Sequence, residues 1–331
     1  MLVYTTLFTL SGKDPQHNKY IDMFYIWFTY LKKYGGLGPD DTFGLIVDEN
    51  TMNFLNSREP FGYISLGAPF SIEVSIMPSP KSIMEGISER YDKYHFTQFA
   101  KHDLNLYLDI DCLCIKNIHR FFGQFNTENS FFAIAEGEMR HPNYRGELLT
   151  AEETDGYIGF SAGWHAWTNT PGQEEFFATV LNGCREWSGE QFYTVDQPFY
   201  NRELFLYMTK QKQKDFTLCA VDEKIVAVNP LIYSPLAEAY FANFPGEPGV
   251  ANCHYDKMLG YMCMEFTLQG PALGAEAPVP QGQPQQPALG AEAPAPAPAP
   301  VEQQQEEHGR PEAASAAHLE QGDSHIQPLS P

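Results

Sequence analysis

The amino-acid sequence predicts an α/β protein in which helices flank a mixed, mainly parallel sheet. Strand-like and helix-like segments alternate from the first residues onward, which is typical of a sheet covered by helices. The strand-like segment 104–108 ends directly in two aspartates, and ligands of open α/β sheets bind beyond the carboxyl ends of strands. From Pro271 onward, large apolar residues almost disappear. We therefore expect one folded domain at 1–265 and a disordered, low-complexity tail at 266–331.

The N-terminal part of the chain predicts the order strand, helix, strand, helix. Residues 2–10 are rich in β-forming residues and predict the first strand. Residues 19–34 carry apolar side chains at helical spacing and are followed by Gly35-Gly36, which predicts an amphipathic helix with a defined end. A strand at 42–47 and a short helix around 51–55 come next.

The following segments lead to the central strand. Strand character appears at 61–66 and 71–76, and Ser79-Pro80 is typical of the start of a helix. This helix would extend to Tyr94 and precede the buried strand 104–108.

Asp109 and Asp111 follow that strand with only Ile110 between them. If the strand continues, both carboxylates point to one face while Ile110 points into the core. Carboxylate oxygens suit Mg²⁺ or Mn²⁺, which complete their coordination with substrate phosphates. The alternative interpretation is a solvated strand end with its acids near a neighbouring helix.

The second half of the chain continues the alternation. An apolar run at 112–118 follows the acids directly, and residues 138–156 form a polar segment expected to be a loop over the site. The remaining predicted strands are 131–135, 156–167, 216–221 and 225–233, and the predicted helices are 171–187, opened by a capping box at Thr170, and 199–208.

Composition limits the classes of partner and compartment. The net charge of −21 disfavours nucleic acid, whose binding depends on neutralising phosphates. The six cysteines include no C-x-x-C pair, and Cys112 and Cys114 should share one strand face as buried, reduced thiols. Residues 1–10 are apolar, but the run is short and lacks the basic n-region of a signal peptide, and no stretch approaches the ~20 apolar residues of a membrane span. We expect a cytoplasmic protein with no nucleic-acid partner and no membrane span.

Four motifs stand in one order along the chain: LYLDIDCLCIKNI around the two aspartates, SAG at 161–163, DQPFYN at 196–201 and HYDK at 254–257. On these motifs, the chain from Leu2 to about Gly260 resembles nucleotide-diphospho-sugar glycosyltransferases of the GT-A fold, which is Rossmann-like. It is most similar to the retaining group that includes glycogenin, galactinol synthase and bacterial galactosyltransferases. The resemblance implies an enzyme that moves a hexosyl or pentosyl group from a nucleotide-sugar donor, by default a UDP-sugar, to a glycan, protein or small-molecule acceptor.

The resemblance also implies roles for individual residues. Mn²⁺ (or Mg²⁺) would be bound by Asp109, Asp111 and His254, and Asp109 would also contact the ribose. Asp196 and Gln197 would lie beside the anomeric carbon as the catalytic pair. The other donor contacts would come from Thr6, Leu7, Phe8, Lys93, Ser161, Ala162, Gly163 and Lys257.

Departures from the family pattern leave alternatives open. Ser161 replaces the usual Asn, and His254 is followed by Tyr-Asp-Lys without the family's Pro-Trp.

A sugar-nucleotide-binding protein without turnover is one alternative. An inverting transferase is another, which needs a carboxylate base near the acceptor, with Asp155, Glu152 and Glu136 as candidates. A phosphoryl or nucleotidyl transferase would need a Gly-rich phosphate loop, and SGKDPQHN near the N-terminus is not one. Asp196-Gln197 could also serve only to cap a helix.

Overall fold

A computed structural model describes residues 1–9, 13–57, 67–78, 91–94, 102–187, 196–212, 215–228, 238–245 and 251–269. All of them belong to the first of two units of the chain, Met1–Gly274. The segment predicted to be a disordered tail lies outside the described residues, apart from 266–269, which end the last helix. The strand expected at 61–66 and most of the helix expected from Ser79 also lie outside them.

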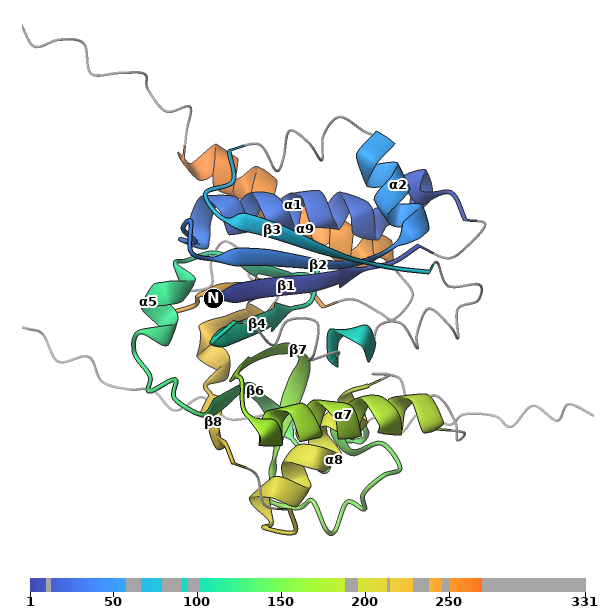
Figure 1. Ribbon diagram of the computed structural model, residues 1–331, viewed down its shortest axis with the longest axis vertical. Helices are drawn as coiled ribbons and strands as arrows, with labels where there is room; N and C mark the ends of the chain where they lie inside the picture. Colours follow the sequence, from blue (N-terminus) through green and yellow to red (C-terminus); the bar gives the residue numbers. More distant parts are fainter. Residues whose placement is uncertain are drawn as a thin grey trace, which may run out of the picture. The chain divides into compact units, whose positions relative to one another are not determined.

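The main sheet has seven strands in the order β3-β2-β1-β4-β7-β6-β8 (Figure 1). Strands β3, β2, β1 and β4 are parallel, β7 runs antiparallel to β4 and β6, and β8 is parallel to β6. The predicted mixed, mainly parallel α/β sheet is confirmed. The strands are β1 (Leu2–Leu7), β2 (Thr42–Asp48), β3 (Ser71–Met77), β4 (Leu104–Leu108), β6 (Ser130–Glu138), β7 (Ile158–Thr168) and β8 (Thr217–Val221).

A second sheet of three short strands lies beyond the end of β4. Its order is β5 (Cys112–Cys114), β10 (Phe241–Asn243) and β9 (Val226–Val228). The apolar run after the aspartates is therefore a three-residue strand followed by helix α5 (Ile118–Phe122). Strand β10 was not predicted. It pairs antiparallel with β5 and so brings the segment 241–244 beside the two aspartates.

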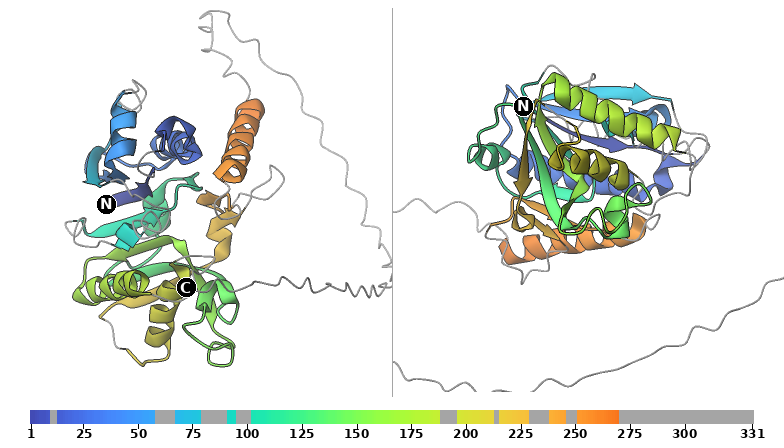
Figure 2. Two further views of the ribbon diagram at one scale, coloured as in Figure 1. Left: turned by 90° about the vertical axis from the view of Figure 1, so that its right-hand side faces the viewer. Right: turned by 90° about the horizontal axis from the view of Figure 1, so that it is seen from below.

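Helices cover both faces of the main sheet. In Figure 2, right, α7 and α9 lie on opposite sides of the strands. Because side chains alternate along a strand, Val3 enters the core that includes α1, whereas Tyr4 enters the core that includes α7 and α8. In the described residues, the helices are α1 (Lys19–Tyr34), α2 (Glu49–Ser57), α5, α6 (Pro142–Arg145), α7 (Pro171–Glu186), α8 (Gln197–Met208) and α9 (Ala251–Gln269), with 3₁₀ turns η1 (Pro15–His17), η2 (Tyr91–Tyr94) and η4 (Glu223–Ile225).

The ends of the helices follow local capping chemistry. The predicted bounds of α1 are confirmed: the Asn18 side chain accepts from the Tyr20 amide at 3.0 Å, and the Gly35 amide donates to the Leu31 carbonyl at 2.9 Å. Thr170 caps α7 as predicted. The segment expected to be a polar loop, 138–156, holds the end of β6, α6 and several turns.

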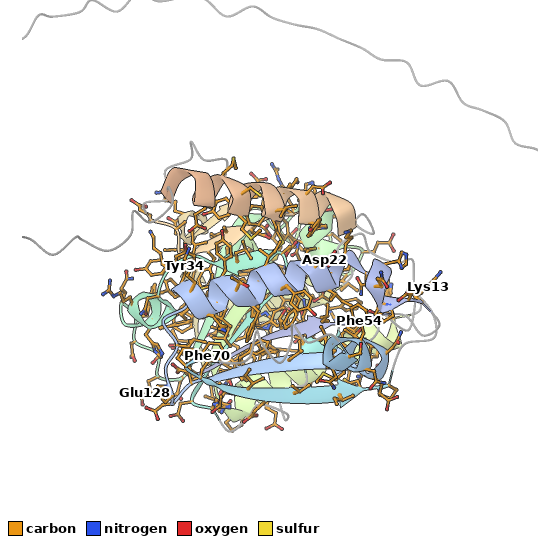
Figure 3. All side chains as sticks on the ribbon, turned by 90° about the horizontal axis from the view of Figure 1, so that it is seen from above. Lys13, Asp22, Tyr34, Phe54, Phe70 and Glu128 are labelled. Atoms are coloured by element: carbon orange, nitrogen blue, oxygen red, sulfur yellow. The ribbon has the colours of Figure 1, made fainter. Side chains whose placement is uncertain are left out.

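Helix α9 runs alongside α1 on the outer face of the sheet (Figure 3). The hydroxyls of Tyr30 and Tyr34 on α1 donate to the carboxylate of Glu265, and Lys33 pairs with the same carboxylate at 3.5 Å. Met258 of α9 is fully buried in the α1 core. Of the described helices, none is both long and apolar enough to cross a membrane.

Candidate active site

The two aspartates lie in a turn at the carboxyl end of the central strand β4. The Asp109 amide donates to the Gly163 carbonyl at 2.8 Å, and the Cys112 amide donates to the Asp109 carbonyl at 2.9 Å. The prediction that 109–111 continues the strand is wrong, because the chain turns here to leave the main sheet and enter the three-stranded one. The turn, rather than strand alternation, sets the directions of the two carboxylates.

A cavity of about 720 Å³ opens at this turn, within the range of roughly 300–1,000 Å³ typical of small-molecule sites. Its walls come from the ends of β1 and β4, from the second half of β6 and the middle of β7, from η2, α6 and α8, and from β9, β10 and the start of α9. All but one of the site residues expected from the sequence line it: Thr6, Leu7, Phe8, Lys93, Asp109, Asp111, Ser161, Ala162, Gly163, Asp196, Gln197 and His254.

Asp109 is held closely from two sides. The Tyr107 hydroxyl donates to its Oδ1, and a Cβ on Gly163 would lie only 2.6 Å from its Oδ2, so glycine is needed there for close approach. Burial raises the pKa of Asp109, the Lys93 ammonium opposes that rise, and the neighbouring Asp111 adds to it. The net direction is upward, as expected for a carboxylate that shares a confined space with another.

Lys93 and Asp196 form a buried ion pair in the cavity wall. Lys93 Nζ lies 2.7 Å from Asp196 Oδ2, and the two side chains are 5% and 11% exposed. The Tyr94 hydroxyl donates to the same oxygen, and Lys93 also donates to the Ala162 carbonyl at 3.1 Å. Burial alone would lower the pKa of Lys93, but the carboxylates of Asp196 and Asp109 raise it above its ordinary value. Lys93 is therefore a charged group facing the cavity.

Asp196 occupies the N-cap position of α8, but its side chain makes no capping hydrogen bond. Its carboxylate is used by Lys93 and Tyr94 instead, so a capping role does not explain Asp196. Gln197 accepts from the Ala162 amide at 3.1 Å and donates to the Asn143 carbonyl at 3.3 Å. The start of α8 thus fixes both the small-residue segment of β7 and helix α6.

His254 reaches the site from the first turn of α9. Its Nδ1 lies 2.8 Å from the Phe244 carbonyl and 3.2 Å from Asp111 Oδ2, and the hydrogen bond with Asp111 raises the pKa of the imidazole. The Phe244 amide in turn donates to the Asp111 carbonyl at 2.9 Å. Lys257 does not line the cavity: it is exposed and donates to the Pro245 carbonyl at 2.6 Å.

The arrangement suits a divalent cation bound by two carboxylates. Within the described ranges, no group of three Asp, Glu, His or Cys side chains is arranged as a metal site, and the ligand role expected for His254 stays a prediction. Mg²⁺ and related ions are often held by one or two carboxylates, with phosphates and waters as the other ligands. Among the described residues that line the cavity, Asp109, Asp111 and Asp196 outnumber the ammonium of Lys93, and a cation would offset this excess negative charge.

Some cavity residues were missed in the sequence. Tyr107 carried a usable signal, since it lies on the predicted strand 104–108, two residues before Asp109. Tyr144 and Asn143 carried none, because they lie in a polar segment with no periodic pattern. In comparisons with protein-family models and with curated proteins, no match to this chain was found.

Proposed function

We propose that this protein is a metal-dependent glycosyltransferase with GT-A architecture, which transfers a hexosyl or pentosyl group from a nucleotide-diphosphate sugar, with a UDP-sugar as the first candidate. The observation that carries the proposal is the Asp109-Ile110-Asp111 turn at the end of the central strand, open to a cavity of about 720 Å³. The parallel strands β3 to β4, followed by antiparallel β7, are compatible with this architecture.

The donor would lie across the ends of β1 and β4. Thr6, Leu7 and Phe8 offer the base a mixed polar and apolar wall beside the aspartate turn. Asp109 and Asp111 would supply the carboxylate ligands of Mn²⁺ or Mg²⁺. When bound, such an ion stabilises the negative charge that develops on the departing nucleoside diphosphate.

The sugar would lie between this turn and the start of α8. Asp196 is fixed there by Lys93 and Tyr94, so its negative charge can stabilise the positive charge that develops at the anomeric carbon. This positioning role agrees with the retaining reaction that the family resemblance implies. The charged Lys93 can also reach the phosphate or sugar of the donor from the same wall.

One observation favours keeping the inverting alternative. Of the three candidate bases, Glu136 lines the cavity, whereas Glu152 is exposed and Asp155 lies 3.5 Å from Arg140 at the surface. An inverting reaction would therefore use Glu136 to accept the proton of the acceptor hydroxyl. The stereochemistry of the product separates the two reactions.

Donor binding is tested by thermal shift with UDP-, GDP- and dTDP-sugars, each with and without Mn²⁺. We expect a shift of several degrees for one donor that disappears with EDTA. Asp111→Asn should abolish this shift without unfolding the protein, and Asp256→Asn, at an exposed carboxylate of α9 outside the cavity, should keep it. Absence of any Mn²⁺-dependent shift would refute the proposal, and binding without sugar transfer would indicate a protein that has lost turnover.

A further inference from the structure

The cavity continues well beyond the end that would hold the nucleotide. Thr6 to Phe8 lie at the end of β1, whereas Glu136 lies on β6, three strands away in the sheet order. With about 4.8 Å between neighbouring strands, the two ends are roughly 14 Å apart. Asn143 and Tyr144 of α6 also line the cavity, and the Tyr144 ring lies against Gly137, the residue that follows Glu136. A donor bound at the aspartates would leave this second end for another molecule.

Tyr144 lies with one face of its ring against bare backbone. Gly137 of β6 and Gly159 of β7 are directly paired across the two strands. A Cβ on Gly159 would lie 2.6 Å from Cγ and 2.9 Å from both Cδ atoms of Tyr144, which places Gly159 under the face of the ring. A Cβ on Gly137 would lie 3.0 Å from the Tyr144 hydroxyl. The ring therefore spans the glycine pair.

The close approach of the ring is the reason for glycine at both positions. Neither Gly137 nor Gly159 has a φ in the left-handed region, so the backbone conformation would accept another residue at either site. Any side chain on either glycine would push the tyrosine away. Glycines on two neighbouring strands thus leave the space in which the Tyr144 ring packs.

Helix α6 holds the ring in place before any ligand arrives. The Gln197 side chain donates to the Asn143 carbonyl at 3.3 Å, which ties α6 to the start of α8. The His141 ring caps the helix at the Asn143 amide, and the Gly146 amide closes it on the Pro142 carbonyl at 2.8 Å. A preorganised contact loses less conformational entropy on binding than a mobile one.

We propose that Tyr144 is a stacking platform for the acceptor and that the acceptor is a glycan presenting a pyranose ring. This inference rests on the proposed function and narrows its acceptor from three classes to one. The C–H face of a pyranose is apolar and matches the half-buried aromatic ring, while its hydroxyls match the Glu136 carboxylate and the Asn143 amide. Glu136 also lines a neighbouring hollow of about 380 Å³, which gives a longer glycan room to continue.

The test measures binding of simple glycosides in the presence of UDP and Mn²⁺. The probes are methyl β-D-glucopyranoside, methyl β-D-galactopyranoside, maltose and lactose, titrated by NMR with saturation transfer from the protein. Tyr144→Phe keeps the ring and should hold the affinity for the bound probe within about twofold. Tyr144→Leu removes the ring and should weaken that affinity about tenfold.

Gly159→Ala gives a second, independent perturbation, because it keeps the tyrosine and displaces it. It should weaken glycoside binding about as much as Tyr144→Leu. Gly38→Ala is the matched control, since an added Cβ there meets no atom within 4 Å, and it should change nothing. None of these variants should alter the Mn²⁺-dependent shift with the donor, which also shows that each remains folded.

Two results would overturn the inference. One is a wild-type protein that binds donor and Mn²⁺ but none of the four glycosides. The other is glycoside binding that Tyr144→Leu and Gly159→Ala leave unchanged. If the proposed function itself is wrong, the result is a different one: the wild-type protein then shows no Mn²⁺-dependent thermal shift with any donor.

Discussion

The buried pair of Lys93 and Asp196 allows a quantitative prediction about stability. Lys93→Met removes an ammonium that lies 2.7 Å from Asp196 and 3.1 Å from the Ala162 carbonyl, and fills the space with an apolar side chain. Among the described residues, Tyr94 is then the remaining hydrogen-bond partner of the buried Asp196 carboxylate. Removing one partner of a buried ion pair typically costs about 3–5 kcal/mol. We expect a loss in this range in the free energy of unfolding.

Urea denaturation followed by fluorescence measures the effect. For a domain of this size, with a denaturant slope near the upper end of about 1–3 kcal/mol per molar urea, the midpoint should fall by at least about 1 M. The double variant Lys93→Met/Asp196→Asn should recover part of the loss, because no unpaired charge remains buried. Lys224→Met, at an exposed pair 3.9 Å apart, is the control and should leave the midpoint unchanged. The single variant Asp196→Asn completes the comparison. The reasoning would be refuted if the losses in unfolding free energy of the two single variants simply added up in the double variant.

Three other predictions concern the turn, the strand beside it and the thiols. Gly163→Ala should abolish the Mn²⁺-dependent donor shift at unchanged fold, because its Cβ would lie 2.6 Å from the first aspartate of the turn; a retained shift would contradict this. Asn201→Leu leaves both the amide and the carbonyl of Phe160 without their buried partner and should cost about 3 kcal/mol in urea denaturation, and a cost below 1 kcal/mol would be too small for that explanation. Burial raises the pKa of Cys114 to about 12, so at pH 8 it stays protonated. Iodoacetamide followed by mass spectrometry should then label the exposed Cys263 and spare Cys114, and equal labelling of both would show that Cys114 is accessible.

Local signals predicted the parts of the fold that depend on them. Helix α1 was located to the residue because Asn18 caps its start and apolar side chains repeat along it. Strand β4 was located because it is a short apolar run bounded by polar residues. Strand β10 has only three residues, and its structure comes from pairing with β5 and β9, which no local pattern records. Helix α9 carries apolar residues around much of its circumference, so no helical period separates it from the surrounding segments.

In the site, too, local patterns were visible in the sequence, whereas contacts between distant segments were not. The pair of aspartates was visible as a motif, but its geometry was not, because the turn depends on bonds to Gly163 and on the second sheet. Lys93 and Asp196 are brought together from distant segments, and only the resemblance to a known family suggested that both belong to one site. The packing of the Tyr144 ring requires two glycines on different strands, and only folding brings these glycines together under the ring.

The late position of α9 in the chain has a consequence for biosynthesis. This helix supplies Met258 to the same core as β1 and α1, and its Glu265 binds Tyr30 and Tyr34. At about 5–20 residues per second, the ribosome adds α9 roughly 12–50 s after β1. Throughout that interval the face of α1 that α9 will cover remains open to water. The nascent chain therefore presents an apolar surface on which chaperones can act, and the cavity gains His254 only near the end of the folded domain's synthesis.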